Sequence, residues 1–221
     1  DLLAQMECGE CKSVVVPLIR QARIMGQKYD VVITNPPYMG ASGMSAKLSD
    51  FVKKNFPDSK ADMFAVFIEK CGMMLKKNGY QAMITQQAWM FLSSYEKLRN
   101  KLQYTDTINM AHLGARAFEE IAGEVVQTVS FVLSSRSIPK YKALYCRLTE
   151  ATTQNGKENL FLSGNNRFSR SKELFALIPG TLNGYYLSDS VFDIFEKGET
   201  LGKAGNARQG LGTSDNARFL R

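Results

Sequence analysis

Four consecutive residues, Asn35-Pro36-Pro37-Tyr38, have the chemistry to hold an amine. Two successive prolines fix the backbone and remove two N–H donors, so the loop is stiff and presents carbonyl oxygens. The residue before a proline is also kept out of the helical region, which extends the loop at Asn35. The side-chain amide of Asn35 adds another oxygen acceptor. Together these groups supply two acceptors close in space, which suits the two N–H groups of an exocyclic amine.

An amine on a nucleobase needs such help to accept a methyl group. Its nitrogen is a poor nucleophile because the lone pair is delocalised into the ring. Two acceptors aimed at its hydrogens favour a tetrahedral nitrogen and stabilise the positive charge that develops during transfer. Tyr38 offers a flat face for a base and an electron-rich face for a cation. The alternative, left open by these residues alone, is a rigid turn after a strand.

The elements around this loop follow an α/β pattern. Residues 29–34 (YDVVIT) form a β-branched run that predicts a buried strand ending at the loop. In an open α/β sheet, ligands bind at the carboxyl ends of the strands, so the loop has the expected position. Further strands are predicted at 80–85, 106–112, 125–133 and 141–147, and helices at 14–25, with Pro17 near its first turn, and at 61–76, 93–103, 170–177 and 188–197.

The order of these elements predicts two regions. Strands and helices alternate to about residue 105, which predicts a layer with parallel strands, and the later strands are expected to form an antiparallel hairpin at the edge. Residues 151–167 are polar and rich in turn residues, and we expect a linker there. The expected division is therefore 1–150 and 151–221.

Composition limits the class of protein. Hydrophobic residues make up 44% of the 221 residues, enough for a core, and the net charge of +7 is compatible with a polyanionic partner. The sequence has no apolar run of membrane-spanning length and no secretion signal. The lone C-x-x-C at Cys8 and Cys11 lacks the second pair of a zinc site, so we expect reduced thiols and no metal. With the missing apolar run and secretion signal, this predicts a cytoplasmic protein without a membrane partner.

The run D-V-V-I-T-N-P-P-Y, residues 30–38, resembles the catalytic motif of class I amino-methyltransferases that act on adenine N6. The resemblance implies a Rossmann-like partial sheet with helices on both faces, and S-adenosylmethionine as methyl donor. It implies that Asn35 and the Pro36 carbonyl hold the target amine and that Tyr38 stacks on a flipped base of double-stranded DNA. Pro37 would contribute to substrate binding.

The resemblance extends to residues outside this loop. Ala61-Asp62-Met63-Phe64 is similar to the next family motif, which implies that Asp62 and Phe64 lie near the cofactor. Asp62 would equally suit the start of a helix. Phe118 resembles the aromatic that covers the target base from its other side, and an ordinary core residue is the alternative.

Four stretches resemble the large adenine methyltransferases of the phage-growth-limitation and BREX phage-defence systems. They are V-V-I-T-N-P-P-Y-M-G, K-A-D-M-F-A-V-F-I-E, I-P-G-T-L-N-G-Y-Y-L-S and R-Q-G-L-G-T-S-D-N-A-R-F-L-R. The last two are similar to the junction with a target-recognition region, which implies that residues 151–221 begin one. Arg208 and Arg218 in the last stretch suit contacts with DNA phosphates or base edges. Other subunits of a defence system are expected partners.

One departure from the family concerns the cofactor. No D-x-x-x-G-x-G pattern precedes Asp30. We therefore expect a middle portion of a longer protein that lacks most of the cofactor-binding half, and an isolated chain that is inactive.

Three alternatives stay open at this point. An enzyme with the same loop can act on RNA or on a protein amide, and a non-catalytic DNA-binding scaffold can keep the fold. His112 has no Ser or Asp partner that spacing identifies, so it receives no catalytic role. Trp89 is expected to be a partly buried core residue.

Overall fold

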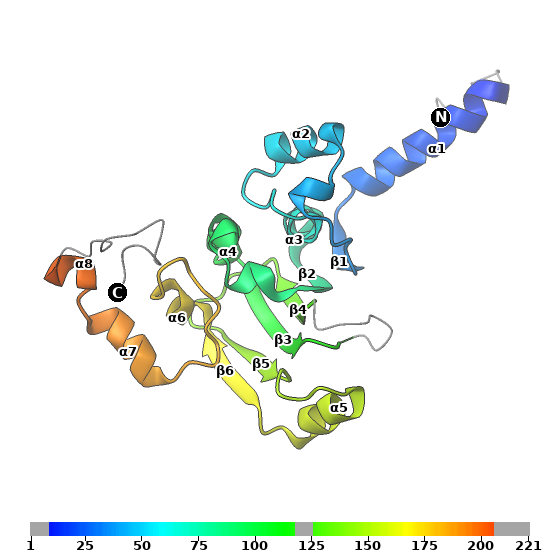
Figure 1. The fold of residues 1–221 in the computed structure, drawn as a ribbon. Helices are drawn as coiled ribbons and strands as arrows, with labels where there is room; N and C mark the ends of the chain where they lie inside the picture. The colour runs from blue at the N-terminus through cyan, green and yellow to red at the C-terminus, as the bar shows by residue number, and fades with distance from the viewer. Residues whose placement is uncertain (1–8, 118–125, 206–221) are drawn as a thin grey trace, which may run out of the picture. The chain divides into compact units, whose positions relative to one another are not determined.

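The computed structural model describes residues 9–117 and 126–205. The strands in Figure 1 are β1 (Tyr29–Thr34), β2 (Leu75–Gln86), β3 (Asp106–Gly114), β4 (Thr128–Ser134), β5 (Lys142–Arg147) and β6 (Arg167–Ser171). The α-helices are α1 (Gly9–Gly26), α2 (Ala46–Asn55), α3 (Met63–Met73), α4 (Glu96–Leu102), α5 (Gln154–Ser163), α6 (Lys172–Ala176), α7 (Asp189–Lys197) and α8 (Leu201–Ala204). The 3-10 helices are η1 (Ala41–Gly43), η2 (Gln87–Met90) and η3 (Ser93–Tyr95). Among the described helices, none has the length and apolar character needed to cross a membrane.

The strands form one mixed sheet in the order β1-β2-β4-β3-β5-β6 (Figure 1). β1 is parallel to β2, and β3 is parallel to β5. β4 lies between β2 and β3 and is antiparallel to both. β1, β2, β3 and β5 therefore point the same way, and their carboxyl ends share one edge of the sheet. Of the later predicted strands, β3 and β4 form an antiparallel pair, but they lie inside the sheet and not at its edge as expected. The antiparallel strand at the edge is β6, which was not predicted.

One face of the sheet carries the core. Along β2, Gln81, Met83 and Thr85 are buried, and the residues between them are partly exposed. This alternation follows from the two-residue period of a strand. Helix α3 contacts β2 through its apolar stripe, in which Phe64 and Ile68 are fully or almost fully buried.

The connection from α3 to β2 differs from the prediction. The helix ends at Met73 and not at residue 76, because Leu75 already pairs with Tyr29 of the neighbouring strand β1. Gly79 lies within β2. A Cβ there would come within 2.9 Å of the Asp30 carbonyl oxygen, so the close approach of the two strands requires glycine.

Helix α1 also differs from the prediction. It begins at Gly9, before the predicted start, and it holds Pro17 in its interior and not in its first turn. The residues predicted as a helix at 93–103 form η3 followed by α4.

Most of the segment predicted as a linker, residues 151–167, forms helix α5. Thr153 caps the helix by accepting a hydrogen bond from the Gly156 amide at 3.1 Å, and Gly164 ends it with a φ of 73°. The buried Lys157 fixes α5 to the sheet by donating to the carbonyls of Leu113 (2.5 Å) and Leu148 (3.2 Å). The polar composition of this segment thus belongs to a helix, α5, that has few apolar residues.

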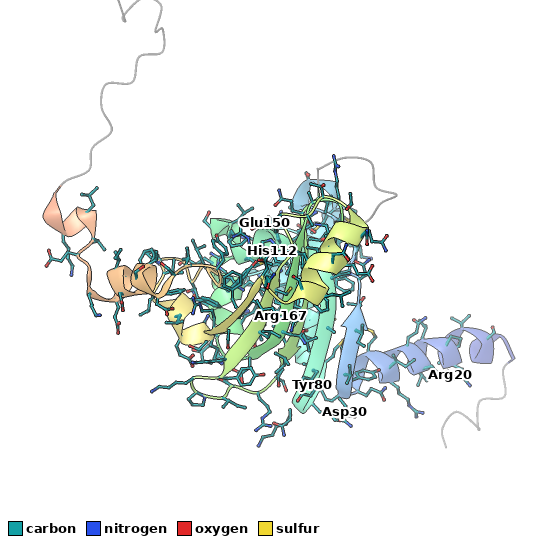
Figure 2. The ribbon with its side chains drawn as sticks, turned by 90° about the horizontal axis from the view of Figure 1, so that it is seen from below. Arg20, Asp30, Tyr80, His112, Glu150 and Arg167 are labelled. Atoms are coloured by element: carbon teal, nitrogen blue, oxygen red, sulfur yellow. The ribbon has the colours of Figure 1, made fainter. Side chains whose placement is uncertain are left out.

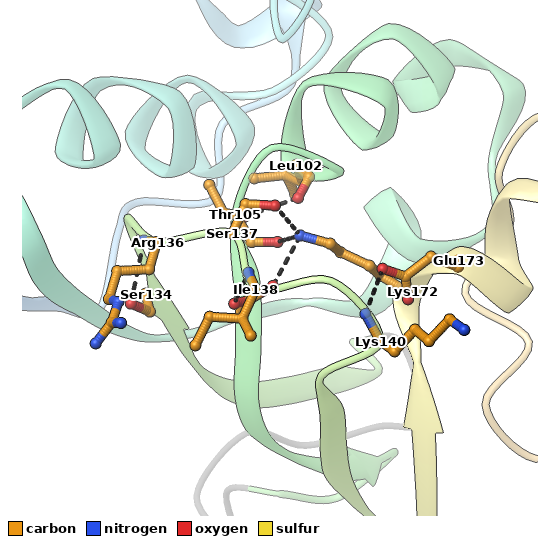
Figure 3. Close-up of polar contacts among 10 residues, drawn as sticks. Leu102, Thr105, Ser134, Arg136, Ser137, Ile138, Lys140, Lys172 and Glu173 are labelled. Carbon is orange, nitrogen blue, oxygen red and sulfur yellow. Dashed lines mark hydrogen bonds and ion pairs between the residues drawn. The ribbon is translucent and has the colours of Figure 1, made fainter.

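Residues beyond 150 also complete the sheet. Lys172, at the start of α6, donates to the Asp106 carboxylate at 2.7 Å, the Ser137 hydroxyl at 2.7 Å and the Thr105 carbonyl at 2.9 Å (Figure 3). Asp106 also accepts the Ile138 amide at 2.8 Å.

The chain divides into compact units at residues 1–186 and 187–221. A target-recognition role for residues 151–221 stays a prediction.

Candidate active site

The loop Asn35–Tyr38 leaves the sheet at the shared carboxyl edge. It follows β1 directly, and Thr34 at the end of β1 pairs with Met83 of β2. Asn35 and Pro37 are exposed, whereas Pro36 is buried and Tyr38 is partly buried. The buried proline anchors the loop, and the Asn35 amide remains accessible to a substrate.

Hydrogen bonds of the Asp62 side chain and of the neighbouring backbone join the end of this loop to the start of α3. Asp62, the N-cap of α3, accepts hydrogen bonds at Oδ1 from the amides of Met39 (3.0 Å) and Phe64 (3.2 Å). The Met63 amide donates to the Met39 carbonyl at 3.0 Å, and Gly40 pairs with Asp62 in an antiparallel bridge. The structure thus brings together Tyr38 and Asp62, which the sequence analysis assigned to two different motifs.

An aromatic row supports Tyr38. Its ring meets that of Phe64 edge to face at 6.1 Å, and Phe64 meets Tyr95 at 5.7 Å. Phe64 is 0% exposed, so the Tyr38 ring packs against a side chain that is itself fixed in the core. The Tyr38 hydroxyl is buried and has no hydrogen-bond partner among the described residues. Burial, followed by the charge of Asp62, raises the pKa of this hydroxyl, so it stays protonated.

A second loop leaves the same edge from β2, the neighbour of β1. Residues 86–92 are held from several sides. The indole Nε1 of Trp89 donates to Thr85 Oγ1 at 3.1 Å, as suits the expected core tryptophan, which is 3% exposed. Arg99, also 3% exposed, donates through Nη1 to the carbonyls of Trp89 (2.9 Å) and Leu92 (2.7 Å). The loop is therefore rigid before any ligand binds.

This second loop borders a cavity of about 320 Å³. Its lining residues are Gln86, Gln87, Ala88, Phe91, Leu92 and Gln127. The amide of Gln87 donates to the Gln127 carbonyl at 2.9 Å, which joins the loop to the segment that leads into β4. The cavity offers an apolar wall and several amide groups.

His112, which the sequence analysis left without a role, lies behind this cavity. Figure 2 places it toward the end of the sheet opposite Asp30 and Tyr80. The ring is 6% exposed, with Nδ1 2.7 Å from the Tyr185 hydroxyl and Nε2 bonded to Gln87 Oε1. Burial, followed by the charges of Arg147 and Lys157, lowers the pKa of His112 to about 4. No spacing in the sequence indicates this arrangement, because Gln87 and Tyr185 are 25 and 73 residues away.

The remaining predicted site residues are Phe118, Arg208 and Arg218. They lie outside the described residues, so their roles stay predictions. In the described part of the chain, no group of three or more His, Cys, Asp or Glu side chains is arranged to hold a metal ion. Cys71 and Cys146 are free and buried.

Comparison with known proteins supports the resemblance derived from the sequence. The family model for the Eco57I restriction-modification methylase matches residues 12–118. The chain is 43% identical over 206 residues to the adenine-specific methyltransferase BrxX of Escherichia coli O9:H4 (strain HS), which covers 93% of this chain and 17% of the relative. It is 41% identical over 211 residues to the adenine-specific methyltransferase PglX of Lacticaseibacillus casei (strain Zhang), which covers 92% and 18%.

The fold comparison agrees. The chain is similar to the methyltransferase subunit of a type I restriction-modification system from Streptococcus thermophilus, with a TM-score of 0.50 and 16% identity over 74% of this chain and 38% of that one. The predicted class I methyltransferase fold and the predicted resemblance to phage-growth-limitation and BREX methyltransferases are thereby confirmed. The chain spans less than a fifth of the length of these two curated relatives.

Proposed function

We propose that this chain carries the catalytic loop of a site-specific DNA adenine-N6 methyltransferase that uses S-adenosylmethionine in a phage-defence or restriction-modification system. One observation carries the proposal. The exposed amide of Asn35 lies at the carboxyl edge of the sheet, in a loop anchored by the buried Pro36 and fixed through Asp62 to helix α3. The names of the two curated relatives support adenine as the target base.

The roles of the loop residues follow from their chemistry. The Asn35 side-chain oxygen and the Pro36 carbonyl accept the two N–H groups of the target amine and stabilise the positive charge that develops on it. Tyr38, supported by Phe64, stacks on the base, which has to leave the duplex to reach the loop. Pro37 is exposed next to these groups and contacts the same base.

The residues present fit the proposed cofactor. Asp62 is 9% exposed, and both of its backbone hydrogen bonds use Oδ1, which leaves Oδ2 for a cationic or hydroxyl group of the cofactor. Its charge lies close enough to Tyr38 to affect the pKa of that hydroxyl. When bound, S-adenosylmethionine supplies the methyl group. Phe64 keeps Tyr38 in place beside the cofactor.

Residues outside the described part complete the proposal. Phe118 covers the target base on the face opposite Tyr38, and Arg208 and Arg218 contact double-stranded DNA. Other subunits of the defence system act with the full-length protein.

The test measures methyl transfer by the full-length gene product to DNA, RNA and protein, together with mapping of N6-methyladenine in host DNA. We expect transfer to DNA alone and modified sites that disappear when the gene is deleted. Asn35→Ala should lower the rate by roughly 100-fold or more. Asn109→Ala, which changes an exposed asparagine of β3 outside the proposed site and target-recognition region, is the matched control and should leave the rate unchanged. Transfer to RNA or protein, or full activity of Asn35→Ala, would contradict the proposal.

A further inference from the structure

Four polar side chains form a continuous hydrogen-bonded row behind the cavity at residues 86–92. The Tyr185 hydroxyl contacts His112 Nδ1, and His112 Nε2 contacts Gln87 Oε1. Gln87 Nε2 in turn donates to Gln127 Oε1. The row crosses from the segment after α6, through β3, to the two loops that border the cavity.

The chemistry of these groups gives the row a single direction. The amide oxygen of Gln87 can only accept, so His112 Nε2 carries a hydrogen. A neutral imidazole has one N–H, so Nδ1 accepts and the Tyr185 hydroxyl donates. Burial keeps His112 neutral by lowering its pKa to about 4. Tyr185, His112 and Gln87 therefore each donate to the next group toward the cavity, and these bonds orient the Gln87 amide. The exposed Gln127 accepts the last of these bonds at Oε1, which turns its own N–H groups away from Gln87.

The deep end of the row is closely packed. Tyr185 is 0% exposed and stacks on Tyr145 with a centroid distance of 5.0 Å and an interplanar angle of 8°. Phe168 meets Tyr185 edge to face at 5.6 Å. At the other end, the backbone of Gln87 is fixed by its 2.9 Å hydrogen bond to Gln127. Preorganised donors of this kind need no rearrangement when a ligand arrives.

The row leaves N–H groups for a ligand. One N–H of Gln87 is used by Gln127, so its second N–H and the two of Gln127 are the next donors in the direction of the row. Both residues line the cavity together with Phe91, which supplies an apolar surface. A site of this composition suits a flat heterocycle that has a ring nitrogen as acceptor.

We propose that Gln87 and Gln127 are specificity-determining residues that donate N–H groups to a ring nitrogen of the target adenine, and that His112 and Tyr185 are positioning residues that orient them. This inference rests on the proposed function. Adenine has unprotonated nitrogens, N1 and N7, on either side of its amine, and guanine carries a hydrogen at N1. N7 is free in both purines, so a donor to N1 beside the amine-binding loop favours adenine over guanine, while Asn35 and Pro36 hold the amine itself.

The decisive experiment changes single atoms in the base. The full-length gene product methylates duplexes in which the target adenine of the mapped recognition site is replaced by 1-deazaadenine or 7-deazaadenine. We expect kcat/KM of the wild type to fall by about 10-fold or more with at least one of these analogues. Gln127→Met should lower kcat/KM on adenine and reduce the preference for adenine over that analogue to about 2-fold or less. Gln21→Met, which changes an exposed glutamine of α1, should keep the wild-type preference.

Variants at His112 separate positioning from folding. His112→Gln can still accept from Tyr185 and donate to Gln87, so it should keep the preference for adenine. His112→Leu should lose the preference while still giving a cooperative thermal unfolding transition, which shows that the loss does not come from misfolding. Equal preference in the wild type, Gln127→Met and His112→Leu would overturn the inference. The proposed function would fail separately, through full activity of Asn35→Ala, so the two failures are distinguishable.

Discussion

Asp62 Oδ1 accepts the backbone amide of Met39 at 3.0 Å, and this bond joins the Asn35–Tyr38 loop to the first turn of α3. The same oxygen caps the helix by accepting the Phe64 amide. One carboxylate thus stabilises a helix and fixes the loop on which the proposed chemistry depends.

Variants at Asp62 separate its structural role from its proposed cofactor role. Asp62→Asn keeps an oxygen acceptor for both amides, so its free energy of unfolding should change little, whereas Asp62→Ala should lower it by about 1–2 kcal/mol. Both variants lack the carboxylate charge, so both should bind S-adenosylmethionine about 10-fold or more weakly. Denaturant unfolding and calorimetric titration of the full-length gene product measure these effects. If Asp62→Asn bound the cofactor as tightly as the wild type, Asp62 would have only the structural role of joining the loop to α3.

Variants at Tyr38 test base stacking. Its hydroxyl is buried without a hydrogen-bond partner among the described residues, so Tyr38→Phe should leave stability unchanged or slightly raised. The phenyl ring still stacks, and methylation should stay within a few-fold of wild type. Tyr38→Ala removes the ring and should lower kcat/KM by roughly 10- to 100-fold. Single-turnover kinetics measure both, and a large loss in Tyr38→Phe would give the hydroxyl itself a role.

The buried His112 predicts a pH dependence of stability. Its pKa of about 4 in the folded protein is below the ordinary value of 6.5, so the unfolded chain binds a proton more readily between these pH values. The contribution of the neutral ring is fully present above pH 6.5 and is lost as pH falls toward 4. The loss amounts to about 3 kcal/mol.

The comparison of wild type with His112→Gln isolates this group. Urea unfolding between pH 4.5 and 7.5 should give a steeper decrease for the wild type, because the variant has no titrating side chain at this position. Parallel curves for the two proteins would show that His112 titrates normally in the fold.

The ion pair of Lys172 with Asp106 should matter for stability. The two side chains are 14% and 2% exposed, and their atoms are 2.7 Å apart (Figure 3). Lys172→Met leaves the Asp106 carboxylate buried without its cation and should lower the free energy of unfolding by about 3 kcal/mol. Lys197→Met, which removes an exposed pair with Asp193 at 3.4 Å, is the matched control and should cost less than about 0.5 kcal/mol. Equal effects of the two substitutions would contradict this difference.

The sequence by itself determined the features that depend on neighbouring residues. The β-branched run at 29–34 predicted β1 with its observed bounds, and the loop Asn35–Tyr38 follows it at the carboxyl edge as expected. The predicted burial of this strand was wrong, because β1 lies at the edge of the described sheet, where Ile33 is 74% exposed. The helix with Asp62 at its start was predicted from the same local rules, because a cap and an apolar stripe lie within a few residues of each other.

Only the tertiary structure decided which distant groups meet. The place of β4 between β2 and β3 depends on pairing between strands that are far apart in the sequence. Helix α5 is fixed by Lys157, which donates to the carbonyls of Leu113 in β3 and of Leu148 just after β5, and no local pattern predicts these contacts. His112 likewise joins Gln87 to Tyr185 only in the folded chain. Local sequence fixes dihedral preferences and caps, whereas these contacts arise from long-range packing, so the proposed catalytic loop was predictable and the row behind the cavity was not.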